Sequence, residues 1–175
     1  MALHIAAVCR SSYYQMRQLW SIKRSLTTTA LQALVQAFVH CRLHYCNTLL
    51  AGVADVPLKR LQSVQNAAAR LVSGSHRCDP ITPVLARLHW LPVRQQIAFK
   101  TAVLVWKAQH GAALVYLSDF YVPVATVSGR QHLRLATAGV LMVLTVQMTT
   151  SQQSFAVNGP TIWNSLPAVL RAPDR

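Results

Sequence analysis

The sequence predicts a mainly α protein, in which a bundle of three to four helices spans residues 1–112 and an irregular tail with room for short strands spans residues 113–175. Two observations lead to this fold class. Apolar residues recur at helical spacing through the first two-thirds of the chain, and caps and breakers divide them into pieces of helix length. After Tyr116 the chain is cut by Pro123, Gly129, Gly139 and Gly159.

The first two helices are expected before residue 52. From about His4 to Arg24 the pattern predicts a helix with an apolar side, which includes Tyr13, Met16, Leu19 and Trp20, and a basic side. Thr27 to Thr29 then offers an N-cap. The next helix carries its apolar residues from Leu31 to Leu49 and is expected to stop at Gly52.

A third helix is expected between Pro57, which suits a first helical turn, and Gly74, which suits a helix end. Its apolar face contains Leu61, Val64, Ala68 and Leu71. The remaining polar and basic residues of this segment fall off that face: Lys59, Arg60, Arg70 and the pair Gln62 and Asn66.

Two further helices are expected, a short one over Thr82–Leu88 and a long one over about Val93–His110. The long one is apolar nearly all round, which predicts burial in the domain centre, with Lys100 and Lys107 on its one wet edge. The tail is rich in Val, Leu and Thr, as in LMVLTVQM, which favours strands or irregular extended structure, although no period-two alternation supports strands.

The charge balance is the most informative bulk property. Seventeen Lys and Arg face four acids, Asp55, Asp79, Asp119 and Asp174, which gives a net charge of +13. Such a surplus favours polyanionic partners, because neutralising phosphates releases condensed counterions. Charge alone implies no sequence specificity, since basic proteins also bind nucleic acid adventitiously. The apolar fraction of 53% argues against intrinsic disorder.

Residues that could carry chemistry are few. His40 and His44 stand four apart beside Cys41, but the spacing offers no third ligand, so neither a metal nor another cofactor is expected. A Cys–His pair drawn from Cys41 or Cys46 is formally available, yet no nucleophile elbow or phosphate loop accompanies it. Reduced cysteines, no signal peptide and no membrane-length apolar run predict an intracellular protein without a membrane partner.

Five stretches resemble, in order and spacing, the region after the polymerase palm in the reverse transcriptases of non-LTR (LINE-type) retrotransposons. These stretches are LVQAFVHCRLHYCNTLLAG (residues 34–52), LKRLQSVQNAAARLVSG (58–74), ITPVLARLHWLPVRQQIAFK (81–100), YLSDF (116–120) and SFAVNGPTIWNSLP (154–167). The motifs VQNAAARL, LHWLPV and WNSLP are the most specific of them, and the match covers nearly the whole chain.

The resemblance implies a helical thumb in residues 1–112 and a post-thumb segment in residues 113–175. In that family the thumb grips the template–primer duplex through its backbone and shape. Polymerisation itself needs closely placed carboxylates that hold Mg²⁺. No two of the four acids are adjacent here, and the family's fingers, palm and endonuclease would lie upstream of Met1. The chain is therefore expected to be catalytically inactive, with no catalytic residues.

Several positions depart from the family pattern. His44 stands where the family usually has an acid, Gly111 to Leu114 replaces a helix-breaking Gly-x-Ala-Pro signal, and the expected basic region before SFAV is the uncharged stretch Leu144 to Gln153. The family also continues beyond WNSLP into another basic helix, where this chain ends at Arg175. The changes are scattered rather than clustered, as they would be in a drifting copy.

The best functional hypothesis is a non-specific grip on RNA or an RNA–DNA duplex through phosphate contacts. The expected contacts are Arg17, Lys23, Arg24, Lys59, Arg60, Arg70 and Arg94. Trp90 and Trp163, which lie inside motifs, are expected to be packing anchors rather than base-stacking platforms. No small-molecule substrate is expected.

Two alternatives remain open. One is an open reading frame of a decayed element, without a selected function, which a cooperative unfolding transition would argue against. The other is a domesticated protein-interaction module, which would dock a partner or self-associate through exposed apolar surface.

Overall fold

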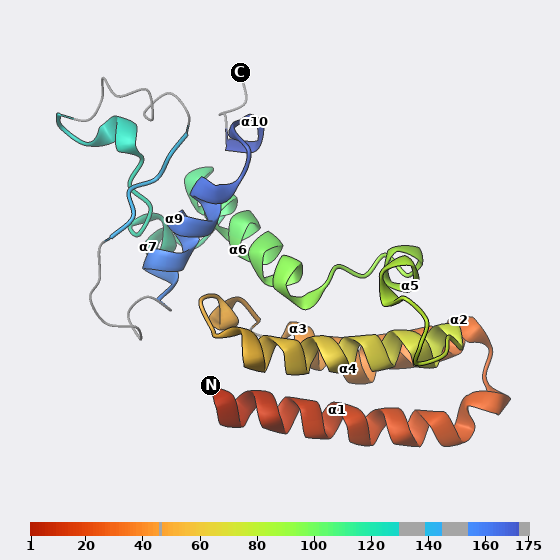
Figure 1. Ribbon diagram of the computed structural model, residues 1–175. Coiled ribbons are helices and arrows are strands. Elements are labelled where there is room, and N and C mark those ends of the chain that lie inside the picture. Colours follow the sequence, from red (N-terminus) through yellow and green to blue (C-terminus); the bar gives the residue numbers. More distant parts are fainter. Residues whose placement is uncertain (46, 130–138, 145–153, 172–175) are drawn as a thin grey trace. The chain divides into compact units, whose positions relative to one another are not determined.

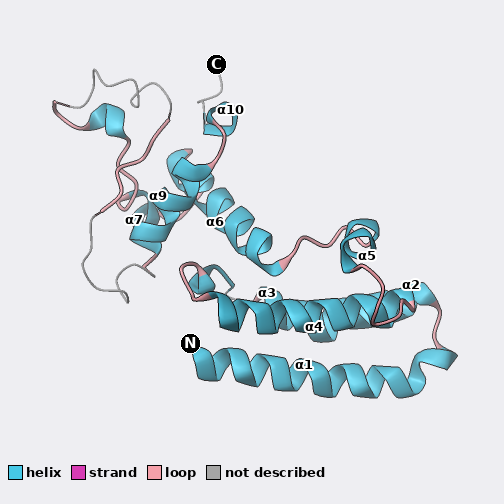
Figure 2. Cartoon of the chain, in the orientation of Figure 1, coloured by secondary structure: helices cyan, strands magenta, loops and turns pink. Residues whose placement is uncertain are grey.

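The structure is a computed structural model that describes residues 1–45, 47–129, 139–144 and 154–171 (Figure 1). It confirms the mainly α fold class. The described residues contain no strand (Figure 2); one isolated antiparallel bridge joins Pro123 to Leu141. The LMVLTVQM stretch therefore adds a bridge at its first residue, and its second half, residues 145–148, lies outside the described residues.

The chain forms two compact units, and each is described by itself. Unit 1 comprises Met1–Asn47 and Val53–Gln96, and unit 2 comprises Thr48–Gly52 and Ile97–Arg175. The division falls inside helix α6 (Val93–Gln109), earlier in the chain than the domain boundary expected after residue 112. That expected boundary stays a prediction.

Unit 1 begins with helix α1 (Ala2–Ile22) and the 3₁₀ turn η1 (Lys23–Ser25). The Thr27 side chain then accepts a hydrogen bond from the Ala30 backbone N–H at 3.2 Å, as an N-cap does, and helix α2 (Thr28–Val35) follows. The helical path continues through a π-helical turn, η2 (Gln36–His40), into α3 (Cys41–His44). Val35, Val39 and Leu43 lie buried along this run, which explains why it stays helical.

The helix expected to reach Gly52 ends earlier, so that part of the prediction is wrong. Tyr45 adopts an extended conformation, and Asn47–Leu50 form a separate 3₁₀ turn, η3. Tyr45 and Leu49 are 72% and 57% exposed. Continuing the helix would therefore bury little apolar surface at these positions, which the sequence pattern had counted as part of the apolar face.

Helix α4 (Asp55–Ser73) is the central element of unit 1. It ends at Gly74, whose φ of +72° is the left-handed conformation that glycine adopts most readily, and the Gly74 N–H donates to the Arg70 carbonyl at 2.9 Å. Its buried face holds Leu61, Val64, Ala68 and Leu71, as predicted, together with Gln65. Helices α1 and α4 run side by side in the same direction (Figure 1).

Helix α5 (Ile81–Arg87) packs on α4 and buries Val84 and Leu85. Its end is a Schellman arrangement, in which the Trp90 N–H donates to the Leu85 carbonyl and the His89 N–H to the Ala86 carbonyl. His89 occupies the left-handed position with a φ of +56°, where glycine is usual.

Unit 2 has a separate core of Val105, Ala108, Tyr121, Leu141 and Trp163. The helical segments around it are α7 (Val115–Ser118), η4 (Val124–Thr126), α9 (Phe155–Ser165) and α10 (Ala168–Arg171), together with α6 from Ile97 onward. Only part of α6 is buried, because Phe99 and Trp106 are 60% and 43% exposed. The predicted burial of α6 on all sides is therefore wrong.

The WNSLP motif organises this second core. Asn164 accepts a hydrogen bond from the Leu141 N–H at 2.9 Å and donates one to the Leu141 carbonyl at 2.8 Å, so its side chain pairs with the backbone as a neighbouring strand would. The Trp163 indole N–H donates to the Gly139 carbonyl at 2.9 Å. None of the helices that the structure describes is long and apolar enough to cross a lipid bilayer.

Candidate nucleic-acid interface

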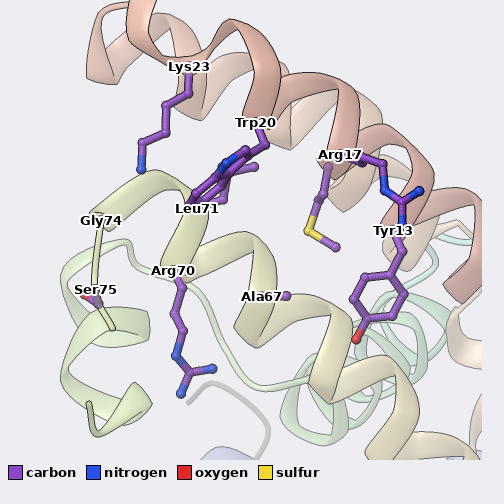
Figure 3. A pocket seen from close by; sticks show the side chains of 10 residues that line it. Tyr13, Arg17, Trp20, Lys23, Ala67, Arg70, Leu71, Gly74 and Ser75 are labelled. Atoms are coloured by element: carbon purple, nitrogen blue, oxygen red, sulfur yellow. The ribbon is translucent and has the colours of Figure 1, made fainter. Parts of the chain in front are cut away.

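An open cleft with a volume of about 550 Å³ runs between α1 and the C-terminal half of α4 (Figure 3). We call it the α1–α4 cleft. Its lining residues repeat at helical spacing on both helices, which places them on facing sides. They are Tyr13, Met16, Arg17, Trp20 and Lys23 from α1 and η1, and Ala67, Arg70, Leu71, Gly74 and Ser75 from α4 and the loop after it.

The cleft combines an apolar base with an aromatic rim. Met16 and Leu71 are buried beneath it, with 7% and 4% of their surface exposed, and Trp20 is 65% exposed. Trp20 was expected on the apolar side of the first helix; it lines the cleft with Met16 on that side, but most of its side chain is exposed. Figure 3 shows Trp20 on α1 at the edge of the cleft, between Lys23 and Arg17 along the helix.

Three cations line the cleft together with this aromatic ring. The Lys23 ammonium lies 5.2 Å from the Trp20 ring centroid, within the range of a cation–π contact. Arg17 is exposed one turn before Trp20. Arg70 is held in place by the loop after α4, since its Nε donates to the His76 carbonyl at 3.1 Å and its terminal NH2 to the Asp79 carbonyl at 3.3 Å.

The helix ends supply an ordinary reason for part of this charge. Because α1 and α4 are parallel, their C-terminal carbonyls lie at the same end of the bundle, and each helix end carries roughly half a negative charge. Two such ends offset roughly one of the positive charges of Arg17, Lys23 and Arg70. The lining contains no acid, so the α1–α4 cleft retains a surplus of positive charge.

The other predicted contacts are placed differently, although all seven lie in unit 1. Arg24 is exposed beside Lys23. Lys59 and Arg60 are exposed near the start of α4; Arg60 lies close enough to Cys9 for its charge to offset part of the rise in the Cys9 thiol pKa that burial causes. Arg94 forms an exposed ion pair with Asp55. The structure therefore brings Arg17, Lys23 and Arg70 together and places Arg94 beside an acid.

The histidine pair is a packing feature of unit 1. His40 Nδ1 lies 3.2 Å from His44 Nε2, and the His40 ring packs on Trp90 with 3.8 Å between ring centroids. Burial, together with the neighbouring His44, lowers the pKa of His40 to about 4. Within the described part of the chain, no group of three His, Cys, Asp or Glu side chains is arranged to hold a metal ion.

The tryptophans separate into two kinds. Trp90 and Trp163, expected to be packing anchors, are 7% and 3% exposed. Trp20 and Trp106 are the exposed ones, and Trp106 stacks on the His110 ring at 4.3 Å. Sequence reasoning did not single out Trp20 beside the cations of the cleft; the available signal was its spacing from Tyr13, Arg17 and Lys23, which puts an aromatic ring and cations on one helix face.

Comparison with models of known protein families, with curated proteins and with solved structures finds no match to this chain.

Proposed function

We propose that this protein is a non-enzymatic nucleic-acid-binding module that grips RNA or an RNA–DNA duplex through its phosphates, irrespective of sequence. The observation that carries the proposal is the convergence of Arg17, Lys23 and Arg70 on one cleft without an acid, in a chain of net charge +13. The resemblance to LINE-type reverse transcriptases adds the expectation of a thumb, and thus of a duplex rather than a free nucleotide.

The grip would work by position and charge. Arg17 and Lys23 are on α1 and η1 and Arg70 is on α4, so a phosphate backbone that follows the cleft would meet cations from both helices. Arg24 would extend this row beyond Lys23, and Arg60 would extend it toward the start of α4. The Arg94 guanidinium would have to leave Asp55 before it reached a phosphate, so we expect it to contribute least.

The test is the salt dependence of duplex binding. The variant Arg17→Gln/Lys23→Gln should bind an RNA–DNA hybrid more weakly, and its plot of log affinity against log salt should be shallower by about two units, one per lost phosphate contact. Arg87→Gln/Lys107→Gln is the matched control, because it removes the same charge from two exposed positions that do not line the cleft. Equal slopes for the two variants would refute the proposal.

A second variant examines the start of α4. Charge reversal of Lys59 and Arg60 should weaken hybrid binding, and unchanged affinity would remove these two residues from the interface. The hybrid should also be compared with plain duplex DNA across the salt series. A preference for the hybrid at physiological salt is expected of a thumb, whereas equal binding that vanishes as salt rises is expected of unselective cationic attraction.

One observation favours a protein-interaction module as a second candidate function. Leu114, Val115 and Tyr116 of unit 2 are consecutive and 59–81% exposed. Three large apolar residues in a row on the surface suit self-association or docking of a partner. Light scattering of the full chain tests this function: a monomer at high concentration, for both the native chain and Val115→Asp, would exclude self-association.

A further inference from the structure

The α1–α4 cleft contains more than a phosphate grip needs. A chain that contacts only backbone phosphates requires cations, yet here an exposed indole stands among them and an apolar base lies below it. Cations over an aromatic platform are the combination that proteins use for single-stranded nucleic acid, where an unpaired base stacks on the ring and its phosphate meets the charge. A fully paired duplex has no free base face to offer.

We propose that the α1–α4 cleft binds one unpaired nucleotide, such as the single-stranded end next to a duplex, with its base stacked on Trp20 and its phosphate held by Arg17 and Lys23. This inference rests on the proposed function and adds to it the form of nucleic acid that the cleft selects. The cleft volume of about 550 Å³ lies inside the roughly 300–1,000 Å³ typical of small-molecule-sized sites.

The geometry gives each side chain a part. The Lys23 ammonium lies over the Trp20 ring, 5.2 Å from its centroid, so it would leave this ring face to the base and move to the phosphate of the bound nucleotide (Figure 3). Met16 and Leu71 form the apolar base of the cleft, below the position proposed for the nucleotide base. The loop carbonyls of His76 and Asp79 hold Arg70, so its guanidinium is positioned before any ligand arrives and loses little freedom on binding.

Neither base nor sequence selectivity follows from this arrangement. Every base has a π-face, so all four bases could stack on Trp20. Recognition of a particular base would need hydrogen-bond donors and acceptors matched to its edge, whereas the cleft supplies cations. We therefore expect modest differences among homopolymers. The discriminating property is the presence of a base, not its identity.

The experiment compares two 12-nucleotide single strands, oligo(dT) and an abasic strand of the same length, which has the phosphates and lacks the bases. Affinities are measured with the full chain by fluorescence anisotropy at fixed salt. Oligo(dT) should bind more tightly than the abasic strand. Trp20→Ala should weaken oligo(dT) binding by about 5- to 150-fold, the range of one base–aromatic stack, and leave abasic binding unchanged.

Two control variants sharpen the result. Trp20→Phe retains a smaller aromatic face and should recover most of the lost affinity. Trp106→Ala removes another exposed tryptophan, which does not line the cleft, and should change neither affinity. Because Trp20 is 65% exposed, Trp20→Ala should retain the native helical circular dichroism, which is checked alongside.

The outcomes separate this inference from the proposed function. If Trp20→Ala weakens the two strands equally, or neither, the stacking inference is wrong, while a shallower salt slope for Arg17→Gln/Lys23→Gln would leave the phosphate grip standing. If the salt slope of Arg17→Gln/Lys23→Gln also equals that of the native chain, the stacking inference and the proposed phosphate grip are both wrong. Competition of oligo(dT) by a hexaglutamate peptide at similar concentration would also overturn the inference, because it would show a site for anions in general.

Discussion

The substitution Gln65→Leu tests how unit 1 is held together. Gln65 is fully buried on α4, and its side-chain N–H donates to the Leu91 carbonyl at 2.8 Å. Its oxygen accepts from the Gln62 amide at 2.9 Å, and the Gln62 oxygen in turn accepts from the Val93 backbone N–H at 2.8 Å. These amides tie the middle of α4 to the chain that leads into α6.

Leucine has nearly the volume of glutamine, so the variant leaves no large cavity and isolates the lost hydrogen bonds. Two bonds disappear, each with a net contribution of about 1 kcal/mol. Their partners retain other contacts, since Leu91 still accepts from Gln96 at 2.5 Å and Gln62 still donates to Asn66 at 2.8 Å. We therefore expect the free energy of unfolding of unit 1 to fall by about 1–2 kcal/mol, without the full penalty of a stranded polar group.

Urea unfolding followed by circular dichroism measures this change, and hydrogen exchange locates it. Amides of α4 should exchange faster in Gln65→Leu, whereas those of α9 in unit 2 should not change. Gln95→Leu is the control, because Gln95 is exposed and its loss should alter the unfolding free energy by no more than about 0.5 kcal/mol. A Gln65→Leu protein as stable as the native one would refute the claim that this network stabilises unit 1.

Three further predictions concern stability, each measured by urea or thermal unfolding. Burial and His44 lower the pKa of His40 to about 4, so as the pH falls the unfolded chain binds this proton before the folded chain does. The free energy of unfolding should therefore be highest above pH 6.5 and fall by up to about 3 kcal/mol as the pH drops toward 4. The variant His40→Leu should abolish most of this pH dependence. Gly159→Ala should destabilise unit 2 by about 1–3 kcal/mol despite better helix propensity, since its new Cβ would lie 2.7 Å from the Tyr121 hydroxyl; equal or greater stability would contradict that close packing. His89→Gly should raise stability by about 0.5–1 kcal/mol by relieving the left-handed backbone, and a loss of stability would show that the imidazole has a role of its own.

Local signals explain which helices could be predicted. The start of α2 and the end of α4 follow from single residues at those positions, namely the Thr27 cap and the left-handed Gly74. The premature end of the α2–α3 run and the exposure of α6 could not be read in the same way. Both depend on which apolar residues find a partner elsewhere in the chain, and a periodic pattern contains no information on that.

The residues of the α1–α4 cleft could likewise be predicted only in part from the sequence. The sequence marked seven cations by charge, but their grouping depends on α1 and α4 being parallel, so that Arg17, Lys23 and Arg70 share one end. Gln65 illustrates the converse. Glutamine is mostly a surface residue, yet Gln65 is buried, and the carbonyl of Leu91, 26 residues away, accepts a hydrogen bond from its side-chain amide.

The packing gives two of the family-like motifs a structural role. Gln65 belongs to VQNAAARL and Leu91 to LHWLPV, so the bond between them gives these motifs a structural role in joining α4 to the segment before α6. Arg70, at the end of the first motif, likewise holds the loop after α4. Residues of these motifs can thus be required by the fold alone, and their presence does not argue for binding.

The residues that distinguish the α1–α4 cleft, Arg17, Trp20 and Lys23, lie outside every stretch that carries the family resemblance. The case for nucleotide binding therefore stands on exposure, charge and spacing in α1, and the Trp20 variants decide it whatever the ancestry of the chain. A positive result would give α1 a binding role that the motifs do not specify. A negative one, together with an unchanged salt slope for Arg17→Gln/Lys23→Gln, would leave the motifs with a structural explanation, in the network of Gln65 and the loop contacts of Arg70.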